Sequence, residues 1–242
     1  MEQALVLTTR QAGEDNRIAT MLSPERGVFE AMLYGGRKSR LRSMVSPWHS
    51  GKIWLYSDQS RSSNKITDFE PLNFHPSLRE NLYKNMAASL VTELIIKTKA
   101  AGENKRTWVL MCGFLDGLEL SEEDECKKGL VRFLWRYLEV MGERPDFSCC
   151  GECGESIAGT KAWFLEKENA FVCSQCHDES MECMFICKEA MEYLSAAAID
   201  TGKTARNMPL SKEAENQLRK LLFRLISSIV DLKSLGAGVG IL

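Results

Sequence analysis

The chain has 242 residues, 44% hydrophobic and 26% charged, a composition typical of a globular protein that can bury a core. No stretch approaches 18 uninterrupted apolar residues, so we expect no membrane span. The N-terminus also lacks the basic and apolar regions of a signal peptide, which favours a cytoplasmic protein without disulfides. No nucleotide-binding or nucleophile motif occurs, and the three histidines form no catalytic arrangement, so we expect no enzyme.

The net charge of −2 is unevenly distributed along the chain. Residues 1–80 carry 11 Lys/Arg and 9 Asp/Glu, a net of +2, whereas the remainder carries 20 and 24, a net of −4. Between Gly35 and Lys65 there are seven basic residues and one acid. The positive charge is therefore local, and a nucleic-acid partner would meet it in the first third of the chain.

Short apolar segments separated by turn residues fill the first 70 or so residues. The alternation of apolar and polar residues predicts about five β-strands, with strong turns such as Ser23–Gly27 between them. We expect a small closed barrel of the OB type over residues 1–77, because closure removes exposed strand edges. The predicted strands are Gln3–Thr9, Arg17–Leu22, Val28–Tyr34, Lys52–Tyr56 and Lys65–Phe69.

After Pro71 and Pro76 the apolar residues recur with helical spacing. We expect an all-α domain over residues 78–242. Its predicted helices run from Leu78 to Gly102, through Trp108–Leu118, from an N-cap at Ser121 to Gly142, through Met181–Ala198 and from Ser211 to near Gly236. An insertion at about 145–180 interrupts this domain. The predicted fold class is α+β, a β-barrel followed by helices that carry a four-cysteine zinc knuckle.

Two C-x-x-C pairs dominate the insertion: Cys150 with Cys153, and Cys173 with Cys176. Nineteen residues separate the pairs, which is the spacing of a tetrahedral zinc site with four thiolate ligands. Such a site has no open position for water or substrate, so the zinc would be structural.

Other interpretations of the cysteines remain open at this stage. Cys173–His177 also matches the haem c attachment string, and either pair could be a redox pair of the thioredoxin kind. Cys149 or His177 could replace a neighbouring ligand. Cys183 and Cys187 have helical i,i+4 spacing, which makes a second metal site conceivable.

A basic run follows the paired glycines Gly35 and Gly36. Its cations are not expected to be buried without partners, so they face water or an anion. We predict that they bind DNA phosphates, with aromatic residues nearby for base stacking, although a solvated loop is the alternative. The predicted DNA-binding residues are Arg37, Lys38, Arg40 and Arg42, and the nearby aromatic residues are Trp48, Trp54 and Tyr56.

Several strings in this sequence together resemble the bacterial recombination-mediator family RecO. The similarity begins with Glu14-x-Asn16-Arg17-Ile18-x-Thr20-x-Leu22-Ser23-Pro24-x-x-Gly27. It continues through Gly35-x-Arg37-Lys38-Ser39-Arg40-Leu41 and Pro47. The cysteine region, Pro145-x-Phe147-x-x-Cys150-x-x-Cys153-Gly154 with Cys173-x-x-Cys176, is similar to the zinc-bearing members, and Leu232-Lys233-Ser234 resembles the family's close. Two departures are Asn16, where members often carry Asp, and the adjacent cysteines Cys149 and Cys150.

The resemblance implies a non-enzymatic role in recombinational repair, near the nucleoid. RecO-like proteins bind single- and double-stranded DNA, anneal complementary strands and, with RecR, help RecA replace single-stranded-DNA-binding protein. The acidic tail of that coat protein would need a basic-rimmed apolar pocket, which we expect among the helical-domain cations Lys127, Lys128, Arg132, Arg136, Arg219, Lys220 and Arg224. Two alternatives are a zinc-ribbon transcription or adaptor protein, and a nucleic-acid enzyme with an OB anticodon-type domain.

Overall fold

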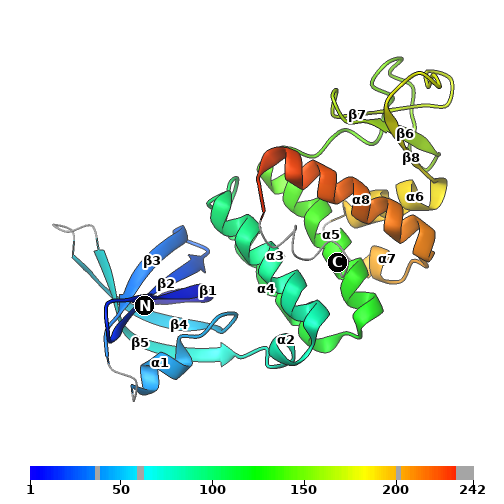
Figure 1. Ribbon diagram of the computed structural model, residues 1–242. Helices are drawn as coiled ribbons and strands as arrows, with labels where there is room; N and C mark the ends of the chain where they lie inside the picture. The colour runs from blue at the N-terminus through cyan, green and yellow to red at the C-terminus, as the bar shows by residue number, and fades with distance from the viewer. Residues whose placement is uncertain (36–38, 59–62, 200–202, 233–242) are drawn as a thin grey trace. The chain divides into compact units, whose positions relative to one another are not determined.

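The computed structural model describes the chain except for residues 36–38, 59–62, 200–202 and 233–242 (Figure 1). The described residues form two compact units. The first comprises Met1–Glu123 together with Leu232, and the second comprises Asp124–Asp231. The barrel and the first helices after it thus share one unit, and the predicted domain division at residue 77 stays a prediction.

Five strands close into a barrel in the order β1-β2-β3-β5-β4, with β4 pairing back onto β1. All neighbours are antiparallel except β3 and β5, which run parallel at Met32 and Lys65. This five-stranded barrel confirms the predicted OB-like fold. Four strands extend beyond both predicted ends, and β3 is shifted by one residue toward the N-terminus: β1 Glu2–Ala12, β2 Asn16–Ser23, β3 Gly27–Leu33, β4 Ser50–Asp58 and β5 Ser63–Asn73.

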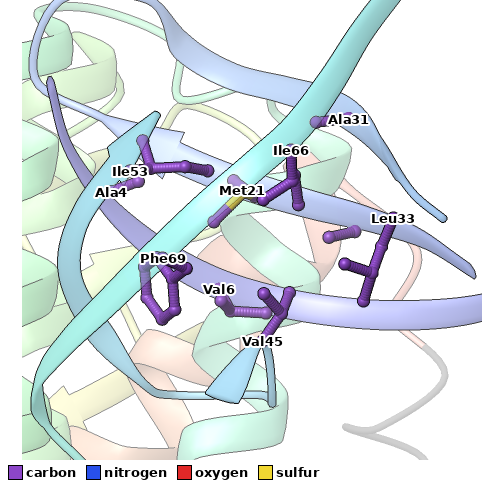
Figure 2. Packing of buried hydrophobic residues seen from close by; sticks show 10 residues of the cluster. Ala4, Val6, Met21, Ala31, Leu33, Val45, Ile53, Ile66 and Phe69 are labelled. Atoms are coloured by element: carbon purple, nitrogen blue, oxygen red, sulfur yellow. The ribbon is translucent and has the colours of Figure 1, made fainter. Parts of the chain in front are cut away.

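Apolar side chains from every strand, from Ala4 to Phe69 in size, fill the barrel (Figure 2). Because successive strand residues point to opposite faces, alternate positions such as Ala4 and Val6, or Ala31 and Leu33, meet inside. The short helix α1, Arg40–Met44, lies between β3 and β4, and its Leu41 and Met44 pack against the same core.

The outer face of the barrel is also buried along part of β1, where the four residues from Ala4 to Leu7 are all inaccessible to solvent. Helix α3, Leu82–Lys97, packs on β1, and α4, Asn104–Leu120, packs on β2 and β3. Trp48 joins these layers, since its indole N–H donates to Thr92 Oγ1 at 3.1 Å. The helices therefore complete the barrel's packing within the first unit.

The predicted continuous helix from Leu78 is wrong, because the chain is extended at Asn81 (φ −111°, ψ 125°). A single turn, α2 Ser77–Glu80, precedes this break. The Asn81 side chain then accepts a hydrogen bond from the backbone N–H of Lys84 and caps α3. The preference of Asn for the N-cap position ends the first turn here, although apolar residues with helical spacing continue on both sides of Asn81.

The second unit contains α5 Glu123–Met141, α6 Lys188–Ala197, α7 Lys203–Arg206 and α8 Lys212–Ile229. Ser211 caps α8 as predicted, accepting from the N–H of Ala214. Helix α5 begins at Glu123, and Ser121 instead ends α4. Of the predicted surface cations, Arg132 is buried and Arg136 is half-buried. Arg132 donates to Tyr193 Oη at 2.8 Å and Arg136 Nε donates to the carbonyl of Ala197 at 2.7 Å.

A three-stranded antiparallel sheet, in the order β7-β6-β8, lies between α5 and α6 in the chain. Its strands are β6 Ala162–Leu165, β7 Ala170–Val172 and β8 Cys183–Ile186. The predicted helix Met181–Ala198 is therefore wrong in its first half, because Cys183–Ile186 pairs with β6 and α6 begins only after Cys187. We call residues 146–187 the ribbon.

No helix within the described ranges is both long enough and apolar enough to cross a membrane.

Candidate metal centre and nucleic-acid interface

The first C-x-x-C pair lies on a tight turn at the start of the ribbon. The Cys150 N–H donates to the Glu155 carbonyl at 2.8 Å, and the Gly154 N–H donates back to the Cys150 carbonyl at 2.9 Å. Gly154 has φ +75°, a conformation that glycine adopts without steric cost. The turn therefore directs both thiols of the pair to one side.

The second pair follows β7 and is held against the first. The Gly151 N–H donates to the Phe171 carbonyl at 2.8 Å, and the Cys173 N–H donates to Cys150 Sγ at 3.3 Å. A Cβ on Gly151 would lie 2.9 Å from the Ala170 side chain, so only glycine fits at this approach. The sequence therefore places the two turns face to face through backbone hydrogen bonds.

The four sulfur atoms of Cys150, Cys153, Cys173 and Cys176 all lie within 4.8 Å of one another. The Sγ atoms of Cys153 and Cys173 are 3.9 Å apart. A tetrahedral ion with metal–sulfur bonds of about 2.3 Å needs sulfur atoms roughly 3.8 Å apart. The thiol cluster is therefore compatible with a structural metal ion, and its four donors would close the coordination sphere.

The electrostatics of the cluster also favour a cation. Burial alone would raise the pKa of Cys150, but hydrogen bonds from the backbone N–H groups of Cys153, Cys173 and Glu152 outweigh it and lower this pKa to about 6. The neighbouring thiols of Cys153 and Cys173 raise the pKa of Cys176 to about 12. Cys150 therefore loses its proton readily, whereas Cys176 keeps its proton at neutral pH. A bound divalent cation would hold both as thiolates, because cysteines that bind a metal are deprotonated.

The neighbouring candidates lie outside this cluster. Cys149 is exposed and accepts a hydrogen bond from Ser148 Oγ at 3.6 Å. The His177 ring stacks on Trp163 with centroids 4.3 Å apart. Cys187 precedes α6, where its N–H donates to Gln217 Oε1 at 2.9 Å. Cys183 lies on β8, so the helical spacing that suggested a second site with Cys187 does not exist.

The predicted DNA-binding cations are placed only in part. Arg37 and Lys38 lie outside the described residues. Arg40 is exposed at the start of α1, and Arg42 is half-buried within it, so the second half of the predicted basic loop is helical. Nη1 of Arg42 is buried and has no hydrogen-bond partner among the described residues.

A second feature of the barrel was not predicted from the sequence. Lys65 on β5 is exposed and pairs across the sheet with Tyr56 on β4. Its Nζ lies 5.2 Å from the ring centroid of Tyr34, which follows β3. Tyr34 is 50% exposed and Tyr56 is 63% exposed. We call these three residues the barrel patch, and exposed rings beside a cation are the elements of a base-stacking surface.

Of the predicted stacking residues, Trp48 is unavailable. It is only 7% exposed and its indole is bonded to Thr92. Trp54 is half-buried on β4, opposite Asp68. Tyr56 alone is well exposed, and it belongs to the barrel patch.

The two parts of the chain match two family models. Residues 1–75 match the model described as Recombination protein O N terminal, and residues 79–235 match Recombination protein O C terminal. The chain belongs to the RecO family. Together the two RecO models cover the barrel, the helices and the ribbon, which bears out the resemblance seen in the sequence motifs.

Curated RecO relatives cover most of the chain at low identity. The protein named DNA repair protein RecO from Oceanobacillus iheyensis is 24% identical over 90% of this chain and 84% of its own length. The protein of the same name from Desulforamulus reducens is 24% identical over 95% and 89%. The one from Desulfitobacterium hafniense is 26% identical over 73% of this chain, and the match spans 64% of that relative.

Proposed function

We propose that this RecO-family chain is a recombination mediator in DNA repair. It binds single- and double-stranded DNA, anneals complementary strands and, with RecR, helps load RecA onto strands coated by single-stranded-DNA-binding protein. The family membership supports the repair role. The observation that carries DNA binding is the barrel patch, where exposed Tyr34 and Tyr56 flank Lys65.

The proposed chemistry requires no bond to be broken. Cations on the barrel neutralise phosphates of two strands, which lowers their repulsion so that complementary bases can meet. The basic run Arg37, Lys38, Arg40 and Arg42 begins three residues after Tyr34 in the sequence, so phosphate contacts would adjoin the stacking contacts along the chain. Such contacts are independent of base sequence, as annealing of arbitrary strands requires.

We also propose that the ion in the ribbon is zinc, because four thiolates form a soft donor set that zinc prefers. The ion would hold Cys150, Cys153, Cys173 and Cys176 and would be structural. Its role is to fold the ribbon and to take no part in DNA binding. The protein is proposed to act in the cytoplasm at the nucleoid.

The direct test is a fluorescence annealing assay on two complementary strands, with and without a coat of single-stranded-DNA-binding protein. The account expects faster annealing than the spontaneous rate with either substrate. Replacing Tyr34 and Tyr56 by Ser should lower the annealing rate, whereas replacing Leu72, an exposed apolar residue on β5, by Ser should not. An annealing rate equal to that of buffer would refute the mediator function.

Contact with the coat protein's acidic tail is proposed to involve the second unit. The pocket of about 430 Å³ beside α8 is a poor receptor, because Glu143 and Glu166 line it against one cation, Arg224. Arg224 is also 3.6 Å from Glu166. The remaining cations on α5 and α8, Lys127, Lys128, Arg219 and Lys220, are better candidates. Calorimetry of a tail peptide should give weak, salt-dependent binding that Lys128→Glu with Lys220→Glu abolishes.

The adaptor alternative makes the ribbon the DNA-contact surface and predicts a footprint at residues 150–176. The enzyme alternative predicts turnover of a nucleotide or tRNA by the purified protein. Either result would replace the mediator function.

A further inference from the structure

The ribbon carries a cluster of aromatic rings on one face of its sheet. Trp163 on β6 pairs with Phe185 on β8, and their ring centroids are 5.5 Å apart. The His177 ring stacks on Trp163 with an interplanar angle of 19°. Lys161 Nζ lies 5.6 Å from the centroid of the same indole. We call these four residues the ribbon face.

The ribbon face extends beyond the buried part of its side of the sheet, where Val172, the partner of Trp163, is fully buried and Leu165 is 6% exposed. The other side of the same strands is more completely buried, since Ala162, Phe164, Phe171 and Ile186 are at most 1% exposed. Phe185 is 44% exposed. Burial of an aromatic side chain is strongly favourable, so this ring would gain stabilisation if a partner covered it. Aromatic residues are enriched in protein–protein interfaces, so an exposed ring supported by two others can serve as an anchor for a partner.

Charge decides which kind of partner fits this face. From Asp146 to Cys187 there are eight acidic residues and two lysines, a net charge of −6. Three of the acids, Asp178, Glu179 and Glu182, lie between His177 and the start of β8 and are exposed, and Glu182 forms an ion pair of 3.6 Å with Lys167 at the surface. A phosphate backbone is repelled by such a surface, whereas a basic polypeptide is attracted to it.

The position of Lys161 also favours a basic partner. Its ammonium group lies over the indole of Trp163, so the ring face already attracts a cation from within the chain. Lys161 is exposed, and an arginine from outside could take its place because guanidinium groups stack on indole rings more readily than ammonium groups do. The ribbon face therefore combines a cation-accepting ring, an apolar anchor and an acidic rim.

We propose that the ribbon face docks a polypeptide segment of another protein that carries arginine or lysine next to an apolar side chain. Phe185 is the apolar anchor, Trp163 receives the cation, and Glu179 and Glu182 form the rim. This surface is distinct from the barrel, and the proposal stands whether or not the mediator function is correct. It assigns the ribbon to protein recognition and the barrel to nucleic acid.

The test uses the full chain and three fluorescein-labelled probes: a peptide of alternating leucine and arginine, its counterpart with glutamate in place of arginine, and a short thymidine strand. Fluorescence anisotropy should show binding of the arginine peptide and none of the glutamate peptide. Phe185→Ser should weaken binding of the arginine peptide by about tenfold or more, as expected for an aromatic anchor. Glu182→Lys should weaken it by roughly two- to fivefold, as expected for a rim charge.

Matched controls lie outside the ribbon. Leu120→Ser removes an apolar residue that is 86% exposed on α4, and Glu14→Lys reverses an exposed charge in the turn after β1; neither should change the affinity. Metal content and amide exchange of residues 146–187 establish whether Phe185→Ser leaves the ribbon folded. If it does not, Glu179→Lys with Glu182→Lys provides the same test without removing a ring.

Three results would overturn the proposal. One is equal affinity for the arginine and glutamate peptides, or no affinity for either. Another is unchanged affinity in the Phe185 and Glu182 variants. The third is protection of the ribbon amides by the thymidine strand and not by the arginine peptide, which would make the face a nucleic-acid surface.

Discussion

The barrel and the ribbon are both β structures, but they are stabilised in different ways. The barrel strands are 7 to 11 residues long and enclose an apolar cluster to which every strand contributes. The ribbon strands have only 3 or 4 residues and bury far fewer apolar side chains. Short strands with a small core are often stabilised by a covalent or metal link, and we propose that an ion held by the thiol cluster stabilises the ribbon as hydrophobic burial stabilises the barrel.

The two regions also differ in charge. The segment from Gly35 to Lys65 carries seven basic residues and one acid, whereas the ribbon carries a net charge of −6. Each has aromatic rings beside a lysine: Tyr34 and Tyr56 near Lys65 on the barrel, and Trp163, which contacts the exposed Phe185, near Lys161 on the ribbon. The same combination of ring and cation thus lies in a basic region on the barrel and in an acidic region on the ribbon. For this reason we assign the barrel to nucleic acid and the ribbon to a basic polypeptide.

The largest expected effect comes from removing one thiol. Cys150→Ala should reduce the metal content from one ion per chain to near zero, because binding of the ion and folding of the ribbon are linked by about 10 kcal/mol or more in small zinc domains. Elemental analysis measures the loss, and hydrogen exchange should show unprotected amides at residues 146–187 and an unchanged barrel. Cys149→Ala, next to the cluster but outside it, should retain the ion. Retention by the Cys150 variant would contradict the assignment.

The barrel should respond to loss of apolar volume instead. Phe69 is fully buried in the barrel core, so Phe69→Ala should lower the free energy of unfolding by about 3–5 kcal/mol. Leu72 is 55% exposed on the same strand, and Leu72→Ala should change it by less than about 0.5 kcal/mol. Hydrogen exchange of the barrel amides at increasing denaturant concentration measures both. If a chelator lowered the barrel's stability as much as Phe69→Ala does, the two regions would not be stabilised separately.

DNA binding should weaken moderately and uniformly when the basic run is removed. If Arg37, Lys38, Arg40 and Arg42 each neutralise one phosphate, replacing all four by Ala should flatten the log–log salt dependence of single-strand binding by about 3, at ~0.7 per phosphate. The affinity loss should be similar for unrelated base sequences. Lys167→Ala, an exposed lysine of the ribbon, is the matched control and should leave the slope unchanged. An unaltered slope in the fourfold variant would make the run a solvated segment.

The smallest expected effect is a pH dependence confined to the first unit. Burial lowers the pKa of His49, a hydrogen bond to the Met44 carbonyl partly opposes this, and the charges of Arg79 and His75 lower it further. The folded state therefore binds fewer protons than the unfolded state below the ordinary pKa of 6.5, so stability falls as the pH drops through the interval between 6.5 and the lowered pKa. His49→Gln should remove this part of the pH dependence in thermal unfolding between pH 7 and 5. An identical dependence in the variant would exclude His49 as its source.

The barrel could be predicted from the sequence because each of its strands has a local sequence pattern that indicates it. Alternating apolar residues and turn sequences such as Ser23–Gly27 indicate both the strands and their ends. The break at Asn81 was missed although Asn is a strong N-cap, because the apolar spacing on both sides suggested one helix. The strand Cys183–Ile186 was missed for another reason. A run of four apolar residues fits a strand or a helix equally well, and only its pairing with β6 decides between them.

The candidate sites also differ in whether a local sequence pattern indicates them. The four cysteines could be found because the spacing of their ligands is a local property of the sequence. The barrel patch could not be found in this way, because Tyr34, Tyr56 and Lys65 are brought together by strand register and by the parallel pairing of β3 with β5. The ribbon face likewise depends on which residues of β6 and β8 share a side of the sheet.

The central claim is that nucleic acid binds the barrel and not the ribbon. Hydrogen exchange of the full chain, with and without a saturating thymidine strand at low salt, tests it most directly. The account predicts slower exchange in residues 28–65, including the basic run and the barrel patch, and unchanged exchange in residues 146–187. Protection of the ribbon with an unchanged barrel would contradict it.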